Sequence, residues 1–422
     1  MEMSSNPTAT ISPSPAVRNY AIVTLAYWAD TLADGAIRML VLFYFYQLGY
    51  SAFQVASLFL FYEFFGVITN LCGGYLASRF GLKSTLFMGL GTQLAALSML
   101  ALMPPRLLTV GYVMASQALS GIAKDLTKMS SKSAVKLVAG DAEGRLYRWV
   151  ALLTGSKNAL KGVGFFLGSL LLSWIGFQAS VWLIASVVGL ALIVAATLLR
   201  GGLGEANKKT KFHHLISRNR SVNLLSIARM FLFGARDVWF VVALPVFLSS
   251  VLGWQYWQAG GFMALWVIGY GAVQAAAPMI LRGKSDPTGA TATKLAFFLA
   301  LIPAAIAAAL YGNLSPAIVV ISGLILFGIV FALNSAVHSF LILAYTDRDK
   351  VSLNVGIYYM ANAGGRLAGT ILSGWLYQLG ITRGDAGGLI ACLAASAVFL
   401  VLAFGISFAL PQRVVLNQAE GH

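Results

Sequence analysis

The sequence predicts an all-α membrane protein whose twelve transmembrane helices form two parallel six-helix repeats. The first observation is composition: of 422 residues, 59% are hydrophobic and only 10% are charged, and the mean hydropathy is +0.79. A water-soluble chain could not bury that much apolar surface. The second observation is that apolar residues gather in runs of roughly twenty, each long enough to cross a bilayer as a helix. The third is an internal repeat with a constant offset.

The first half of the chain contains six apolar runs with short polar connections. We expect helices at residues 19–47, 52–77, 85–103, 108–135, 147–174 and 177–199. The fourth helix is unusual, because its apolar part at 110–119 is too short to span a bilayer alone. The lysine-rich stretch that follows must therefore also lie partly at membrane depth.

A long polar segment at residues 200–220 separates these helices from six further apolar runs. The later runs predict helices at 222–250, 256–281, 291–311, 316–344, 351–379 and 386–409. The Ser/Pro/Thr-rich N-terminus is typical of a disordered tail, and it lacks the features of a cleaved signal peptide. The expected organisation is a tail at 1–17, an N-terminal bundle at 18–199, a cytoplasmic linker at 200–220, a C-terminal bundle at 221–410 and a tail at 411–422.

The two groups of helices are related by an internal repeat. Residues 48–54 resemble residues 252–258, and the pair at 158–159 matches the pair at 362–363. Both offsets are 204 residues (252 − 48 and 362 − 158). Two unconnected matches at one offset indicate duplication. Because each repeat contains an even number of helices, the repeats share one orientation in the membrane.

Lysine and arginine residues are distributed unevenly between the two sets of loops. The loops on one side carry most of them, whereas the loops on the other side carry only Arg106 and Arg383. The positive-inside rule then places the linker and both termini in the cytoplasm. The net charge of +15 is mostly a topology signal, so we expect the lipid bilayer and no nucleic acid as a partner.

A lysine stripe begins in the fourth expected helix. Lys124, Lys128, Lys132 and Lys136 recur every fourth residue, which places them on one face of a helix. Charged groups at membrane depth are costly and tend to face a water-filled path or a partner. The stripe therefore indicates a polar cavity inside the bundle.

The expected helices contain more basic than acidic residues. Nine basic and five acidic residues lie within them, a surplus of +9 − 5 = +4. Each uncompensated charge at mid-membrane costs about 2.5–3.5 kcal/mol, so the missing partner is predicted to be a small anionic substrate. The candidate substrate-binding residues are Arg38, Lys124, Lys128, Lys157, Lys161, Arg229, Arg236 and Arg366. The candidate proton-coupling residues are Asp30, Asp34, Glu63, Asp125 and Asp237.

These charged groups also have plainer interpretations. Asp125 beside Lys124, and Asp237 beside Arg236, are candidates for structural pairs. Glu63 is more isolated, and it either carries a proton or accepts a hydrogen bond. Lysines near helix ends extend to the membrane surface, an interpretation that suits Lys132, Lys136 and Lys294.

Enzymatic chemistry is not indicated. The chain contains no Walker motif, no dinucleotide fingerprint and no catalytic-triad pattern. The two cysteines, Cys72 and Cys392, lie in apolar runs without metal-ligand spacing. We therefore expect no cofactor and no metal site, and the sequence favours secondary transport.

Residues 74–83 (GYLASRFGLK) resemble the signature loop between the second and third helices of the major facilitator superfamily. Ser78 stands where that loop usually has an acid, and the fifth helix lacks the proline of the superfamily's antiporter motif. The resemblance implies the major facilitator fold. It also implies a cavity lined by helices 1, 2, 4, 5, 7, 8, 10 and 11, and all eight candidate substrate-binding residues fall on these helices.

Long segments also resemble the ArsJ family of bacterial organoarsenical efflux permeases. They are 29–42 (ADTLADGAIRMLVL), 60–71 (LFYEFFGVITNL), 120–137 (SGIAKDLTKMSSKSAVKL), 149–168 (WVALLTGSKNALKGVGFFLG) and 233–248 (FGARDVWFVVALPVFL). The resemblance implies a bacterial inner-membrane exporter, expected to be a monomer, for 1-arseno-3-phosphoglycerate. Glyceraldehyde-3-phosphate dehydrogenase, the functional partner, makes this ester when arsenate replaces phosphate. The exported ester then decomposes to arsenate and phosphoglycerate.

Other functions fit parts of the same pattern. A transporter or uptake exchanger for another organophosphate or organic anion would share the basic cavity and differ in ligand and direction. A membrane sensor of phosphorylated metabolites is disfavoured by the short loops and the lack of a soluble signalling domain. An exporter of cationic drugs is disfavoured because the cavity has the wrong sign of charge.

Overall fold

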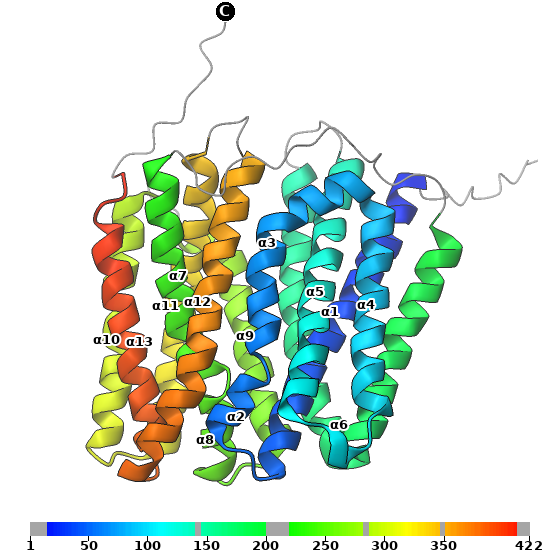
Figure 1. Cartoon of the computed structure of the whole chain (residues 1–422). Helices are drawn as coiled ribbons and strands as arrows, with labels where there is room; N and C mark the ends of the chain where they lie inside the picture. Colours follow the sequence, from blue (N-terminus) through cyan, green and yellow to red (C-terminus); the bar gives the residue numbers. More distant parts are fainter. Residues whose placement is uncertain (1–14, 140–144, 200–218, 282–286, 347–350, 412–422) are drawn as a thin grey trace, which may run out of the picture.

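A computed structural model describes residues 15–139, 145–199, 219–281, 287–346 and 351–411. Within these ranges, every regular element is a helix and no strand occurs (Figure 1). The predicted all-α fold is confirmed. The expected tails and most of the linker lie outside the described residues.

The first half of the chain forms six helices, of which the last is two spans joined end to end. They are α1 (Pro15–Gln47), α2 (Ala52–Ser57), α3 (Leu60–Phe80), α4 (Leu82–Leu102), α5 (Val110–Ala139) and α6 (Arg145–Leu198). A straight helix of 54 residues would measure roughly 80 Å, more than twice the hydrocarbon core. The chain turns at Gly176, whose φ of 74° and ψ of 178° suit glycine and interrupt the helix.

The second half follows the same plan. It comprises α7 (Arg220–Phe240), α8 (Ala243–Ser250), α9 (Tyr256–Ile280), α10 (Gly289–Tyr311), α11 (Pro316–Ala344), α12 (Val351–Gly380) and α13 (Gly387–Ser407). Short 3-10 turns lie at Pro105–Leu107 and Ile381–Arg383. If α2 with α3 and α7 with α8 are each counted as one interrupted span, the described helices make twelve crossings, as predicted.

The interruption between α7 and α8 is stabilised from outside the helix. The backbone N–H groups of Val242 and Ala243 donate to the Oγ of Ser373 in α12, at 3.2 and 3.1 Å. A broken helix leaves donors without intrahelical partners, and in an apolar environment they require such a side chain. The sequence did not predict this break, because the apolar run continues through it.

Composition alone identifies eight of the described helical segments as long and apolar enough to cross a membrane. One of these, Ser156–Leu198, contains both spans of α6. The long helices that are not apolar enough to be identified in this way are α1, α5 and α12. Each of these three helices carries buried or partly buried charged residues, such as Asp30 in α1 and Arg366 in α12.

The helices form two bundles that lie side by side, α1–α6 and α7–α13 (Figure 1). The bundles meet where α6 packs on α9 and where α12 packs on α2 and α3. Glycine allows the closest approaches within each bundle. A Cβ on Gly168 of α6 would lie 2.1 Å from the Ala36 carbonyl of α1, and one on Gly365 of α12 would lie 2.0 Å from the Met230 carbonyl of α7.

The two bundles are packed tightly at the end where α1 finishes and where α2 and α8 lie (Figure 1). There Phe43 of α1 stacks on Tyr256 at the start of α9, with ring centroids 4.7 Å apart. Gly374 of α12 packs directly on Ala52 and Ala56 of α2. The side chains of α8 from Ala243 to Leu248 are buried. This end of the molecule is therefore closed between the bundles.

Candidate cation-lined cavity

A cavity of about 260 Å³ lies between the two bundles. Its lining comes from α1, α3, α5 and the first span of α6, and from α7, α9, α11 and α12. In order of crossing, these are spans 1, 2, 4, 5, 7, 8, 10 and 11, the set that the superfamily resemblance implies. The remaining spans contribute no lining residue in the described part of the chain.

The cavity extends from mid-membrane toward the end where α1 begins. On α1 its lining runs from Tyr27 to Arg38, and on α12 it runs from Tyr359 to Arg366. Beyond these positions lie the aromatic contacts and the buried α8 that close the opposite end. The structure therefore presents a cavity with a closed floor at mid-membrane.

All eight basic residues singled out from the sequence line this cavity: Arg38, Lys124, Lys128, Lys157, Lys161, Arg229, Arg236 and Arg366. Four of the five acidic residues line it as well: Asp34, Glu63, Asp125 and Asp237. The lining charge is therefore +8 − 4 = +4. Asp30 is buried and is not among the lining residues, and Lys294 is exposed on α10. The side chains of Lys132 and Lys136 lie outside the described residues.

Five of the lining charges form a chain of ion pairs across mid-membrane. Glu63 of α3 accepts from Arg38 at 3.2 Å and from Arg366 of α12 at 2.6 Å. Asp237 of α7 accepts from Arg366 at 3.2 Å and from Arg236 at 2.5 Å. The expectation that Glu63 stands apart was wrong, because two arginines from different helices converge on it. The Arg366–Glu63 pair joins the two bundles.

A second group of polar contacts lies within the first bundle. Asp34 accepts from Lys161 at 3.1 Å and from the hydroxyl of Tyr62. Asp125 bonds Lys128 and not its sequence neighbour Lys124. The expected Lys124–Asp125 pair is therefore corrected: Asp125 pairs with the lysine three residues on, which lies on the same helix face. The other expected pair of neighbours, Arg236–Asp237, is present. Asp125 also accepts from Thr69 at 2.7 Å and from Asn70 at 3.2 Å.

Lys124 and Arg229 are bonded to no carboxylate in the described residues. The Nζ of Lys124 lies 3.9 Å from the centroid of the Tyr62 ring. The guanidinium carbon of Arg229 lies 3.9 Å from the centroid of Phe233, and its N–H groups donate to Asn362 and to Ser335 at 3.1 Å. Aromatic rings and neutral acceptors thus hold both cations without cancelling their charge.

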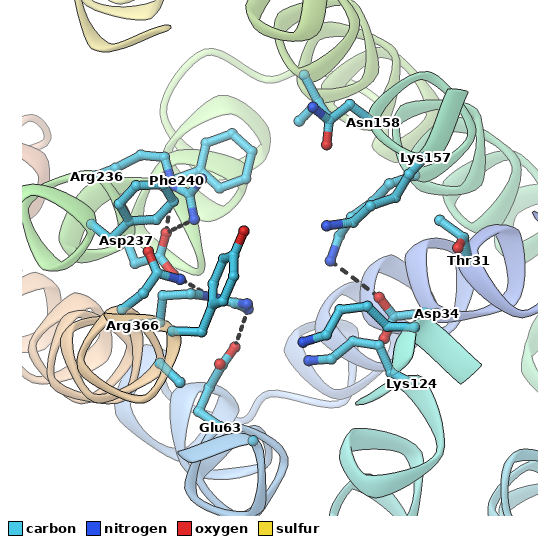
Figure 2. Close-up of a pocket in the computed structure, with 18 of the residues that line it drawn as sticks. Thr31, Asp34, Glu63, Lys124, Lys157, Asn158, Arg236, Asp237, Phe240 and Arg366 are labelled. Atoms are coloured by element: carbon cyan, nitrogen blue, oxygen red, sulfur yellow. Dashed lines mark hydrogen bonds and ion pairs between the residues drawn. The ribbon is translucent and has the colours of Figure 1, made fainter. Parts of the chain in front are cut away.

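The two groups face one another across open space. Figure 2 shows Arg236, Asp237 and Arg366 on one side, and Lys124, Lys157 and Asp34 on the other. The cations on the second bundle are all arginines, whereas four of the five on the first are lysines. The cavity can therefore present positive groups to both ends of a small ligand.

Several uncharged residues of the site were not singled out from the sequence. Tyr62 is one of them: its side chain is 3% exposed, its hydroxyl donates to Asp34, and its ring lies under Lys124. Asn70 and Asn362 are further examples. In the sequence, the one signal for Tyr62 is its position beside Glu63. Its contacts with Asp34 of α1 and Lys124 of α5 form only in the folded bundle.

Comparison with known proteins agrees with this geometry. The family model described as Major Facilitator Superfamily matches residues 23–370. Among solved structures, a mutant of the nucleoside transporter NupG is similar at a TM-score of 0.70 and 14% sequence identity, with 93% of this chain and 99% of that chain covered. At this identity the similarity shows the fold alone. No curated protein sequence matches the chain.

Proposed function

The chain is a transporter of the Major Facilitator Superfamily, and we propose that it exports 1-arseno-3-phosphoglycerate, an ester with an anionic group at each end. The observation that carries the proposal is the lining charge of +4 in a cavity between the bundles. A ligand with two or more negative charges would neutralise this surplus. Phosphate and arsenate groups accept hydrogen bonds from lysine and arginine in the same geometry.

Lys124 and Arg229 are the cations proposed to hold the two ends of the substrate. Lys124 belongs to the first bundle and Arg229 to the second, and both lack a carboxylate partner within the described residues. A bound anion therefore does not have to displace an acid from either. In contrast, Arg38, Arg236 and Arg366 already bond carboxylates and serve chiefly to position the floor of the cavity.

The positions of the cysteines support a pentavalent arsenate ester over trivalent arsenic. Soft thiolate ligands would be expected for a trivalent arsenic site, by analogy with other soft ions. Cys392 is fully buried on α13, and Cys72 of α3 is not among the lining residues. The lining offers nitrogen donors, which suit arsenate as they suit phosphate.

The direction of transport follows from charge. The positive-inside rule places the end toward which the cavity extends on the cytoplasmic side of a bacterial inner membrane. An inside-negative potential favours outward movement of anions by about 2.3 kcal/mol per charge per 100 mV. A doubly charged ester therefore needs no further energy source to leave the cell. Glyceraldehyde-3-phosphate dehydrogenase would act by producing the substrate.

A second candidate is export or exchange of another organophosphate or organic anion. The observation that favours it is that every basic group of the lining binds phosphate as readily as arsenate. None of the described contacts distinguishes a phosphate group from an arsenate group. This candidate shares the cavity, the cations and the fold, and differs only in the ligand.

The test is arsenic uptake by everted membrane vesicles that contain the protein. One sample receives arsenate alone, and the other receives arsenate with glyceraldehyde 3-phosphate, NAD and the dehydrogenase. Uptake only in the complete mixture is the expected result. A matched control carries Lys294→Gln, which removes an exposed lysine outside the cavity. Equal uptake in both samples, or none in either with folded protein, would contradict the arsenate ester as substrate.

A further inference from the structure

Asp30 of α1 is a buried carboxyl group to which no cation is bonded in the described residues. Its side chain is 1% exposed. One oxygen, Oδ2, lies 2.5 Å from the hydroxyl of Thr127 in α5. The other oxygen, Oδ1, has no hydrogen-bond partner. Each of the other four acids near the cavity bonds a lysine or an arginine: Asp34, Glu63, Asp125 and Asp237.

An ionised carboxylate in this position would be strongly disfavoured. Removing a charge from water without an ion partner is far more costly than burying a neutral polar group. An ionised carboxylate also has two charged oxygens to satisfy, whereas one oxygen here accepts no hydrogen bond from the described residues. Protonation removes the charge and leaves only a neutral carbonyl oxygen without a partner.

We propose that Asp30 is a proton-binding site and that its carboxyl group donates the bound proton to the Oγ1 of Thr127. The hydroxyl of Thr127 has a second direction for its own hydrogen, because the Lys124 carbonyl lies at 3.0 Å and the Ala123 carbonyl at 3.2 Å. Every hydrogen in this small network then has an acceptor. Loss of the proton reverses the bond, so that Thr127 donates to the carboxylate.

The charged and titratable groups around Asp30 come from three helices: Tyr27 and Asp34 of α1, Lys124 and Asp125 of α5, and Lys161 of α6, which bonds Asp34. From α4, Gly89 packs on Thr127, and the charged residue of that helix, Lys83, donates to the Leu199 carbonyl. α2 contains no charged residue. Lys124 is thus the cation near Asp30 that contacts no carboxylate.

The proton site therefore regulates the anion site, an inference that rests on the proposed function. An ionised Asp30 attracts Lys124 and competes with a substrate anion for it. A protonated Asp30 leaves the ammonium group to the substrate. Proton and anion consequently bind together, so the affinity for an anion of constant charge increases as pH falls through the titration of Asp30. Asp30→Asn, which mimics the protonated form, removes this dependence.

Infrared spectroscopy of the purified, substrate-free protein tests the site directly. A protonated carboxyl group gives a carbonyl-stretch band that ionised carboxylates do not give and that shifts in deuterium oxide. The band is expected in the wild-type protein and is expected to disappear in Asp30→Asn. In Asp34→Asn it is expected to persist, because Asp34 is ion-paired. Absence from the wild type, or persistence in Asp30→Asn, would overturn the assignment.

A second variant keeps the test decisive if Asp30→Asn does not fold. Thr127→Val removes the hydroxyl that bonds the carboxyl group, so the band is expected to move to higher frequency without disappearing. An unmoved band would overturn the proposed bond. The infrared measurement uses no substrate, so it is independent of the transport proposal. A failure of arsenic uptake in vesicles would contradict the transport proposal and not the proton site. A failure of the infrared test would contradict the proton site and not the transport proposal.

Discussion

At the scale of single residues, the cations that line the cavity are of two kinds. Some are bonded to a carboxylate, and others are bonded to none among the described residues and can bind a ligand. Lys128 and Lys161 each bond an aspartate, whereas Lys124 rests on the ring of Tyr62. A cation held by an aromatic face keeps its donors for a ligand. This difference in partners, and not the number of basic residues, is the basis for proposing Lys124 as a substrate-binding residue.

Lys124→Gln is expected to weaken substrate binding by roughly 10- to 100-fold, because one charged hydrogen bond contributes about 1.5–3 kcal/mol. Apparent affinity can be measured from the concentration dependence of arsenic uptake in vesicles. Lys294→Gln provides the matched loss of one exposed charge and is expected to have no effect. Similar affinities for the two variants would contradict the role of Lys124.

Substitutions of Tyr62 separate its two contacts. Tyr62→Phe removes the hydroxyl that bonds Asp34 but keeps the ring under Lys124, whereas Tyr62→Ala removes both. We expect a smaller loss of affinity for Tyr62→Phe, since the cation–ring contact contributes about 0.5–2 kcal/mol. Vesicle uptake at equal protein level measures the difference. Equal losses in the two variants would show that the ring does not hold Lys124.

At the scale of helices, close packing depends on small residues at the crossing points. α6 approaches α1 so closely at Gly168 that an added Cβ would lie 2.1 Å from the Ala36 carbonyl. This approach brings Lys161 and Asp34 within bonding distance. The parts of α1 and α6 that pack together therefore also carry residues of the site.

Gly168→Ala is expected to destabilise the protein by about 1–3 kcal/mol through overpacking. Gly91→Ala on α4 is the matched control, because its added Cβ would meet nothing within 4 Å. Helix propensity favours alanine at both positions by a similar amount. A lower melting temperature is expected only for Gly168→Ala, and unchanged stability of that variant would refute the close α1–α6 contact.

The elements were largely predictable because the length of an apolar run and the polar turns between runs determine a membrane helix. Helical spacing also indicated correctly that Lys124 and Lys128 face the same cavity. Among the ion pairs, Arg236–Asp237 was expected from the sequence and is present, whereas the pairs between helices were not predictable. Glu63 and Arg366 are 303 residues apart, and no local pattern records which side chains meet when α3 packs on α12. The breaks at α2–α3 and α7–α8 were missed because apolar composition continues through them.

At the scale of the whole molecule, the structure has one closed end and one cavity. Rocking of the bundles against each other would require the closed end to open. The Arg366–Glu63 pair at 2.6 Å connects the bundles at the floor of the cavity, so it stabilises the closed arrangement. A substrate anion that competes for Arg366 would loosen this connection.

Glu63→Gln is expected to shift the population toward a form that is open at the α2–α8 end, because it removes the charge that holds Arg366 and Arg38. Spin labels at Leu102 of α4 and Tyr311 of α10, both exposed at that end in different bundles, report the separation. The distance between the two labels is expected to be longer in Glu63→Gln than in the control variant Lys294→Gln. An unchanged distance distribution would show that the pair does not restrain the bundles.

The most direct test of the central claim is ligand binding by the purified protein, followed as the shift in melting temperature. Two hydrolysis-resistant probes with the same three-carbon chain are compared: a bisphosphonate with an anionic group at each end, and the corresponding monophosphonate. The cation-lined cavity predicts clear stabilisation by the bisphosphonate, reduced by salt and by Lys124→Gln or Arg229→Gln, and little by the monophosphonate. Equal shifts for the two probes, or a bisphosphonate shift that persists in both variants, would contradict a site for a doubly anionic substrate.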